Sequence, residues 1–338
     1  MNRADLSTAF WALWYGPHLS DMDVAIGIDT SCYTTSTAAL DRDGRLVSEV
    51  RIPLVVKPGG RGLSQSEMVF QHVRNLPLVM EEMRRVMGPG RRIVAVGTSC
   101  RPRPVEGSYM PVFLAGCGTA RTLGAAMNCP VIEISHQENH VLAGLWSAGV
   151  EIETDFLAVH ASGGTTEILR ARLAVDGFEI ELLGGTVDLH AGQFLDRVGV
   201  SMGLPFPAGP HLERLATLCD GIPPKTPVSV DGCNISFSGP ETHVKRWLAS
   251  EPEPAAVASS VQYCIAESLQ RALTAAVDSS GLRTVLLVGG VAANEFIRVH
   301  VAEALQRSQK VSVFWPAPEF SGDNAVGAAW WALKHKVV

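Results

Sequence analysis

Two histidines four residues apart, His136 and His140, are the side chains of this sequence whose spacing best suits metal binding. On an α-helix, residues four apart lie one turn apart on the same face. Neutral imidazoles placed in this way can hold one transition-metal ion, as in the helical histidine pair of zinc metalloproteases. Those enzymes carry glutamate directly after the first histidine, where this chain has Gln137, and Glu138 falls elsewhere on the helix. The pair predicts metal binding without the protease base, and two ordinary helical histidines are the alternative.

A carboxylate near the end of the chain is a candidate for a further metal ligand. Asp323 lies in the stretch 320–325, directly before the closing helix that the pattern predicts. An aspartate at such a position often caps the helix. The sequence leaves both roles open, a cap or a metal ligand.

Two turns rich in hydroxyl groups follow apolar strands. The first turn, 30–36, follows the run 24–29, and the second, 162–166, follows the run 156–161. Backbone N–H and hydroxyl groups in such turns can receive phosphate oxygens, although Ser/Thr turns are common without any ligand. Because each turn leads into a returning strand, we predict two domains that open with the same strand–turn–strand unit and a phosphate-binding cleft between them.

Two further stretches suit a nucleoside. A helix predicted to start near residue 186 places Asp188, Gly192 and Asp196 four apart on one face, with room for a ribose or a ring beside the glycine. An exposed acidic helix face is the alternative. After the predicted strand 284–288, the stretch 289–294 opens a helix. Its glycines let a ligand lie against the backbone, and the helix N-terminus favours an anion or an adenine edge.

The elements that must position these side chains alternate between strand and helix. Strands are predicted from apolar runs and helices from apolar positions at helical spacing. The strands are 24–29, 37–40, 46–50, 93–97, 131–134, 156–161, 167–171, 284–288 and 311–315, and the long helices are 65–87, 112–127 and 255–277. This pattern predicts an α/β protein.

Composition limits the class of protein. The chain has 338 residues, 46% apolar and 18% charged, enough for about two domains with sizeable cores. We expect an N-terminal extension (1–22), a first domain (23–150) completed by the closing helix (323–338), and a second domain (151–322).

Charge and cysteine content limit the partners and the compartment. The formal net charge of -6 argues against tight autonomous binding of nucleic acid, but not against a local basic patch or a basic partner subunit. Seven scattered cysteines without a CxxC pair indicate reduced thiols in the cytoplasm. No stretch reaches transmembrane length.

Eight motifs over residues 24–330 appear in the order found in one family: IGIDTSCYTTS, ISHQENH, SGGTTE, DLHAGQFLD, GLPFPAGP, ISFSG, VGGVAAN and SGDNA. The chain resembles the TsaD family, formerly Gcp or glycoprotease, whose archaeal and eukaryotic members are the catalytic subunit of the KEOPS complex. The resemblance implies an actin-like ATPase fold (ASKHA, duplicated RNase H-like), with two similar α/β domains and an interdomain cleft.

The resemblance also implies an activity and its cofactors. Family members transfer a threonylcarbamoyl group from its adenylate to N6 of the tRNA adenosine next to the anticodon. The implied cofactors are one divalent metal (Fe or Zn) and ATP or an acyl-adenylate. The implied partners are a nucleotide ligand, tRNA reached through partner proteins, and a second subunit, in a homodimer or a heterodimer with a protein of the same fold. The implied location is cytoplasmic, with no membrane.

Matching motif to motif carries the family's site onto this chain, without assigning a catalytic residue. His136, His140 and Asp323 fall on the metal ligands, and His160 falls where archaeal members have a tyrosine ligand. Imidazole suits zinc or iron at least as well as phenolate. The nucleotide-binding positions are Ser31, Cys32, Ser162, Gly163, Gly164, Asp188, Gly192, Asp196, Gly289, Gly290 and Asn294.

The chain departs from the family pattern around this metal set. Tyr33 and Thr34 replace two acids, Thr165 alters the second turn, and Glu241 stands where the family has lysine. DDAAG has become DLHAG, and a glycine-rich stretch has become the loop 101–107. These changes indicate a divergent bacterial paralogue. The alternatives to the tRNA reaction are another acceptor or acyl group, a non-catalytic ATP-binding scaffold and, last, a metallopeptidase.

Overall fold

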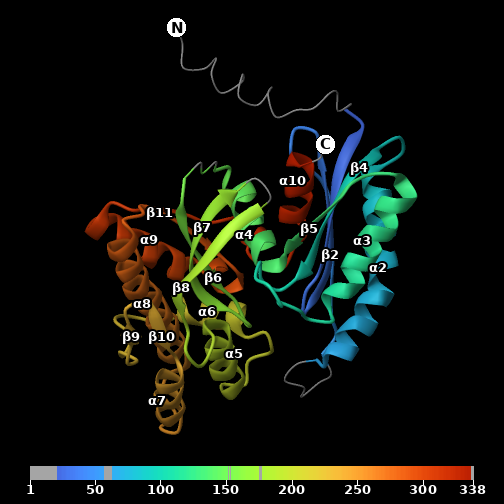
Figure 1. The fold of residues 1–338 in the computed structure, drawn as a ribbon. Coiled ribbons are helices and arrows are strands. Elements are labelled where there is room, and N and C mark those ends of the chain that lie inside the picture. Colours follow the sequence, from blue (N-terminus) through green and yellow to red (C-terminus); the bar gives the residue numbers. More distant parts are fainter. Residues whose placement is uncertain (1–20, 57–62, 151, 153, 175–176, 336–338) are drawn as a thin grey trace. The chain divides into compact units, whose positions relative to one another are not determined.

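The computed structural model describes residues 21–56, 63–150, 152, 154–174 and 177–335 (Figure 1). Apart from residues 21 and 22, the predicted N-terminal extension lies outside the described residues, as do the last three residues of the predicted closing helix. The described chain forms two units. One contains the residues up to Trp146 together with those from Asp323 onward, and the other runs from Ser147 to Gly322.

The first unit is built on a five-stranded sheet in the order β3-β2-β1-β4-β5. Its strands are β1 (Asp23–Thr30), β2 (Thr34–Asp41), β3 (Leu46–Pro53), β4 (Arg92–Arg101) and β5 (Val131–Ser135). Its helices are α2 (Gln65–Met87), α3 (Phe113–Met127), α4 (His136–Ala148) and α10 (Val326–Lys334).

Strand β1 is the middle strand of this sheet, and all eight of its residues are buried. Its side chains alternate between the two faces of the sheet. Ile26 and Ile28 belong to the apolar core shared with α2 and α3. Gly27 faces α10, and a Cβ added there would come within 2.0 Å of the carbonyl oxygen of Ala325. The sheet is therefore covered by α2 and α3 on one face and by α10 on the other (Figure 1).

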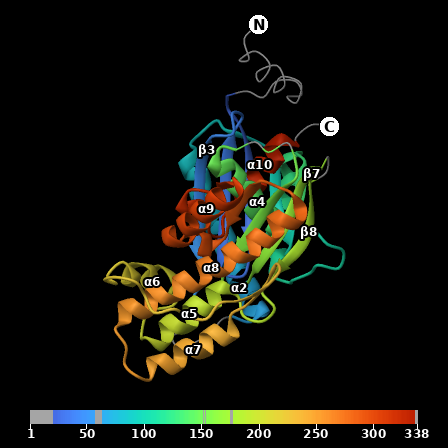
Figure 2. The same cartoon turned by 90° about the vertical axis from the view of Figure 1, so that its left-hand side faces the viewer.

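The second unit repeats this plan with a sheet in the order β12-β11-β6-β7-β8. Its strands are β6 (Phe156–Ala161), β7 (Thr166–Ala174), β8 (Gly177–Gly185), β11 (Thr284–Val288) and β12 (Ser312–Phe314), with a small sheet of β9 (Ser229–Asp231) and β10 (Asn234–Ser236). Its helices are α5 (Ala191–Ser201), α6 (Gly209–Ala216), α7 (Ser238–Leu248), α8 (Pro254–Ser280) and α9 (Glu295–Gln309), with 3₁₀ turns η1 (Gly290–Ala293) and η2 (Pro318–Phe320). The long helix α8 packs against both α6 and α9 (Figure 2).

The two sheets share one topology, which confirms the predicted internal repeat. In each unit the first strand pairs antiparallel with the second strand and parallel with the strand that follows the long connection. Both hydroxyl-rich turns lie between the first two strands of a unit. The repeat therefore places the two turns at equivalent positions in the two units.

Three findings bear on other predictions from the sequence. Cys100 and Cys117 form a disulfide with Cα atoms 5.2 Å apart, so the prediction that every thiol is reduced is wrong. The pair is 17 residues apart, and only the packing of α3 on β4 brings the two sulfurs together. Helix α5 starts at Ala191 rather than near 186, because the chain makes a turn around Asp188 first. Among the described residues, no helix is long and apolar enough to cross a membrane.

Candidate functional site

The histidine pair opens helix α4. His136 is the first helical residue, after strand β5 ends at the buried residues Ile134 and Ser135. The backbone N–H of Glu138 donates to the hydroxyl of Ser135 (3.1 Å), and its carboxylate accepts from the backbone N–H of Ser135 (2.7 Å). This reciprocal pattern is a capping box. It fixes the start of the helix and directs the Glu138 carboxylate to the backbone at the N-terminus.

Three ligand atoms from distant parts of the first unit meet at this helix start. The Nε2 atoms of His136 and His140 lie 3.1 Å apart, and Asp323 Oδ1 lies 3.6 Å from the first and 3.4 Å from the second. Two nitrogen ligands about 2.1 Å from one tetrahedral zinc ion stand about 3.4 Å apart. The three atoms therefore have the mutual spacing of ligands to one ion, and these residues fit a metal.

The position of Asp323 depends on two neighbouring amides. Asn324, rather than Asp323, accepts the hydrogen bond from the backbone N–H of Val326 at the start of α10 (2.9 Å). The side chain of Asn139 donates to the carbonyl oxygen of Asn324 (2.6 Å) and accepts from the backbone N–H of Ala328 (2.8 Å). These bonds tie α4 to the start of α10. The Asn324 side chain thus bonds the backbone at the helix start, while the Asp323 carboxylate lies beside the two histidines.

The charges around the pair favour a cation. Burial lowers the pKa of His136, but Asp29 and Asp323 outweigh that effect and raise the pKa to about 10. Burial and the positive charge of His136 lower the pKa of His140. Burial raises the pKa of Asp323, but both histidines outweigh it and hold that pKa well below its usual range. Two carboxylates thus surround the pair, and their charge matches that of a divalent ion.

Asp29 also belongs to this cluster, although it was not among the residues predicted from the sequence. It is fully buried at the end of β1, and its Oδ1 lies 3.0 Å from Nδ1 of His136. Its Oδ2 is also buried and has no hydrogen-bond partner among the described residues. A carboxylate that accepts the Nδ1 proton of a histidine leaves Nε2 as the ligand atom. The acid that ends the buried run 24–29 was the signal that could have identified it.

The first hydroxyl-rich turn lies in the same unit, and a third histidine holds it through two hydrogen bonds. His72 of α2 is buried, its Nε2 donates to the carbonyl oxygen of Ser31 (2.7 Å), and its Nδ1 accepts from the hydroxyl of Thr35 (2.8 Å). Burial lowers the pKa of His72, which suits this neutral tautomer. Ser31 Oγ is buried and has no hydrogen-bond partner among the described residues. Such a donor fits a phosphate oxygen.

Cys32, in the same turn, is not suited to be a nucleophile. Burial, with the nearby carboxylates of Asp323 and Asp29, raises the pKa of its thiol to about 11. Its sulfur lies 3.6 Å from the sulfur of Met110. The thiol is therefore protonated at neutral pH. Only the backbone N–H of Cys32 or van der Waals contact with its side chain can contribute to ligand binding.

The second turn lies in the other unit, directly after β6. His160 is buried near the end of that strand, whereas Gly163 and Gly164 are exposed. A Cβ added at either glycine would meet no atom within 4 Å. Gly192 of α5 packs on this turn, because a Cβ there would come within 2.6 Å of the carbonyl oxygen of Ser162. The absence of a side chain at Gly192 therefore allows α5 to pack closely against the turn.

The remaining predicted residues of the second unit have structural partners. The carboxylate of Asp196 accepts from the backbone N–H of Ala208 (2.7 Å). Asn294 caps α9 by accepting from the backbone N–H of Ile297 (2.9 Å). Gly289 has φ of +96° and lies against the carbonyl oxygen of Ala161, so no other residue fits there. Gly290 next to it opens η1.

Asp188 precedes α5 and does not share its helical face, so the predicted face of three residues is wrong. Its carboxylate accepts from the hydroxyls of Ser236 (2.6 Å) and Ser238 and from the backbone N–H groups of Phe237 (2.9 Å) and Leu189 (2.5 Å). Burial is the largest single influence and raises its pKa, but these donors together outweigh it and hold the pKa well below its usual range. Asp188 therefore connects the segment before α5 to the start of α7.

Replacing Asp188 with asparagine should destabilise the protein. We expect a loss of roughly 1–2 kcal/mol of unfolding free energy at pH 7, since the hydrogen bonds go to a charged but exposed group. The pKa is depressed in the folded state, so this stability is fully present above the unfolded pKa of about 3.9 and is lost as the pH falls further. Urea titrations at pH 7, 5 and 3 should show the difference from wild type shrink towards pH 3. Asp231→Asn is the matched control, and an equal loss there would contradict this role.

Comparisons with known proteins identify the family of this chain. The TsaD family, described as tRNA N6-adenosine threonylcarbamoyltransferase, matches residues 56–330. A tRNA N6-adenosine threonylcarbamoyltransferase of Granulibacter bethesdensis is 32% identical over 334 residues, covering 91% of this chain and 87% of that protein.

Solved structures show the fold alone. Full-length HypF in its phosphate- and nucleotide-bound form aligns with a TM-score of 0.57 at 13% identity, over 93% of this chain and 46% of that one. Component A of (R)-2-hydroxyglutaryl-CoA dehydratase from Acidaminococcus fermentans aligns with a TM-score of 0.54 at 14% identity, over 93% and 98%. These neighbours confirm the predicted actin-like ATPase fold. With the family match over most of its length, the chain belongs to the TsaD family of transferases.

Proposed function

We propose that this protein transfers a threonylcarbamoyl group from threonylcarbamoyl-adenylate to N6 of an adenosine in tRNA. The observation that carries the proposal is the cluster of His136, His140 and Asp323, whose ligand atoms lie 3.1–3.6 Å apart. Two imidazoles and a carboxylate suit zinc or iron. When bound, the divalent metal supplies positive charge that polarises the carbonyl and phosphate oxygens of the donor.

The other residues of the first unit hold and orient this centre. Asp29 accepts the Nδ1 proton of His136, which leaves Nε2 as the atom that would hold the ion. The hydroxyl of Ser31 is buried near the same strand end and is a donor for a phosphate oxygen. His72 fixes the backbone of that turn through the carbonyl oxygen of Ser31. These contacts support donor binding at the turn.

The nucleotide positions in the second unit complete the proposal. The exposed backbone of Gly163 and Gly164 can approach a phosphate without steric conflict. From the resemblance we propose that His160 is a further metal ligand. On the same ground we propose that the nucleoside is bound by Asp188, Gly192, Asp196 and the stretch 289–294.

The structure favours this reaction over peptide hydrolysis. Glu138, the acid nearest the pair in sequence, accepts from the backbone N–H of Ser135 at the helix start. The changed residue Glu241 is also accounted for, since it pairs with Lys245 (2.7 Å) and Arg197 (3.5 Å) of its own unit. Its negative charge is therefore balanced and does not by itself oppose a tRNA acceptor.

We also propose a cytoplasmic location and tRNA delivery through partner proteins. The tRNA substrate supports the location, and the net charge of -6 supports the need for a basic partner. The partner is proposed to be a second copy of this chain or a same-fold protein. Size measurements of the protein alone and with candidate partners distinguish the two.

The direct test is product formation. Protein, threonylcarbamoyl-adenylate, partner proteins and unmodified tRNA are incubated, and the digested tRNA is analysed for the modified adenosine. We expect the modified nucleoside with wild-type protein and none with Asp323→Asn. Release of the carbamoyl group without modified adenosine would indicate another acceptor. No consumption of the adenylate by metal-loaded protein would rule out the transferase.

A further inference from the structure

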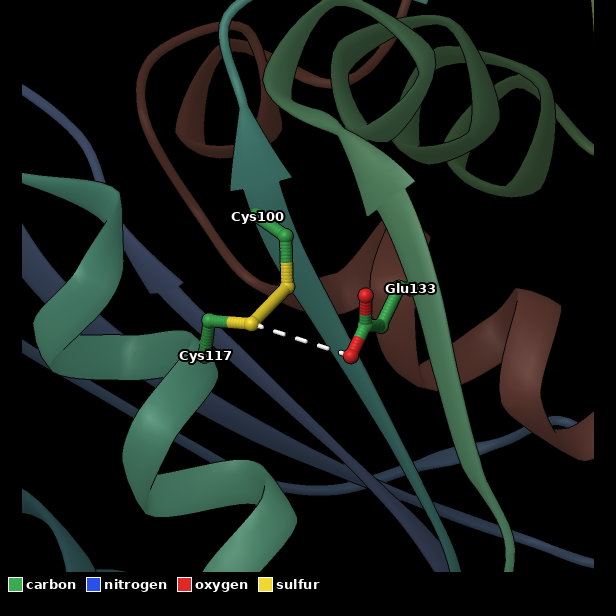
Figure 3. A group of neighbouring side chains, drawn as sticks. All are labelled: Cys100, Cys117 and Glu133. Carbon is green, nitrogen blue, oxygen red and sulfur yellow. Dashed lines mark hydrogen bonds between the residues drawn. A yellow bond between two sulfur atoms is a disulfide. The ribbon is translucent and has the colours of Figure 1, made fainter. Parts of the chain in front are cut away.

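A second group of reactive side chains lies on the α3 face of the first sheet (Figure 3). Cys100 is half-buried near the end of β4, and Cys117 is buried in α3. Their Cα atoms are 5.2 Å apart, within the range that a disulfide spans without backbone movement. Cys100 is therefore the thiol that a reagent in solvent reaches first.

A carboxylate next to the pair favours the reduced state. Glu133 of β5 has its Oε1 3.8 Å from the sulfur of Cys117 and 2.6 Å from Nε of Arg121, one helical turn beyond Cys117. A thiol can donate to this oxygen, whereas a disulfide sulfur carries no proton to donate. Backbone spacing thus permits the bonded pair, and Glu133 offers the free Cys117 thiol an acceptor, so the site can accommodate both states.

Each cysteine lies next to a segment that supports the proposed metal centre. The backbone N–H of Gly116, beside Cys117, donates to Oγ1 of Thr30, which follows Asp29 (3.0 Å). The carbonyl oxygen of Pro102, two residues after Cys100, accepts from the backbone N–H of Gln137, which follows His136 (3.1 Å). A covalent bond between the cysteines therefore restrains both segments at once.

We propose that Cys100 and Cys117 form a reversible dithiol–disulfide site that exchanges with small-molecule disulfides of the glutathione type. The Cys100 thiol loses its proton to solvent and attacks one sulfur of the reagent, so the reagent's S–S bond breaks and one thiolate leaves. The Cys117 thiol then loses its proton to solvent, and its thiolate attacks the Cys100 sulfur of the mixed disulfide and releases the second thiolate. The two released thiolates take up the two protons. Two protein thiols are oxidised and one reagent disulfide is reduced to two thiols. In a reducing compartment such a pair is transient and responds to redox state.

Counting alkylated cysteines tests the pairing without any activity assay. Full-length protein is equilibrated with mixtures of reduced and oxidised glutathione, quenched with acid, unfolded and alkylated. We expect seven adducts in the reduced protein and five in the oxidised protein, with a peptide linking residues 100 and 117. Cys100→Ser and Cys117→Ser should each abolish the linked peptide. Cys129→Ser, the control, should keep it and show six and four adducts.

Hydrogen exchange tests the structural consequence in metal-free protein. The amides of Gly116 and Gln137 should exchange more slowly in the oxidised form than in the reduced form, and the Cys100→Ser variant should show no such difference. Seven adducts at every glutathione ratio would overturn the proposal, as would a disulfide that excess dithiothreitol leaves intact in the folded protein. A zinc ion that protects both thiols from alkylation and prevents their pairing would instead make the group, with Glu133, a metal site. Because neither readout needs the transferase reaction, failure here and failure of the proposed function are distinguishable.

Discussion

Replacing His140 with alanine is expected to remove the metal and the transferase activity together. Structural zinc sites in zinc-finger peptides bind the ion with about 10–16 kcal/mol, shared among their ligands, so the loss of one ligand here should weaken binding by roughly 10²–10³-fold. Competition with a chromophoric chelator measures the affinity, and elemental analysis of untagged protein measures the metal content. Asp323→Asn should have a comparable effect, because its Oδ1 lies 3.4 Å from Nε2 of His140.

The matched control is His335→Ala in the same unit. That ring lies against Trp331 in a tilted arrangement and has no part in the cluster, so its loss should leave the metal content unchanged. His160→Ala tests the ligand proposed from the resemblance, and a loss like that of His140→Ala would make it a ligand. If His140→Ala protein keeps one equivalent of metal at wild-type affinity, the assignment of the centre is wrong.

Replacing Asp29 with asparagine should weaken the metal site without removing any ligand. The carboxylate fixes the Nδ1 proton of His136 and supplies one of the two negative charges near the ion. Partners of this kind contribute roughly 10–100-fold to metal affinity or activity. We therefore expect a drop of that size in affinity for zinc, measured by the same chelator competition, and reduced formation of the modified nucleoside at limiting metal.

Asp23→Asn separates this effect from a general loss of stability. Asp23 is a buried carboxylate at the opposite end of the same strand, paired with Arg92 (2.8 Å). Its replacement should lower the unfolding free energy but leave the zinc affinity as in wild type. If Asp23→Asn and Asp29→Asn change the affinity equally, Asp29 acts on the fold rather than on His136.

The sequence by itself determined the α/β class, the histidine pair and the repeated strand–turn–strand unit, because each of these rests on local spacing, whereas the actin-like fold came from the resemblance. Residues 136 and 140 are four apart, so any helix stacks them on one face. The two turns follow apolar runs, so strands must lead into them. The family motifs added Asp323, for which local pattern alone allowed a cap as readily as a ligand.

Only the tertiary structure decided which groups meet. Asp323 lies 3.6 Å from His136 because α10 packs on β1 at Gly27, a contact between residues about three hundred positions apart. The same holds for Asp29, which contacts the metal cluster from β1, and for His72, which contacts the first turn from α2. Neither contact exists until the sheet has formed. The Cys100–Cys117 pair likewise depends on the packing of α3 against β4. Contacts of this kind arise when whole faces of helices and sheets are buried against one another. The spacing of residues within one helix or strand therefore does not predict them.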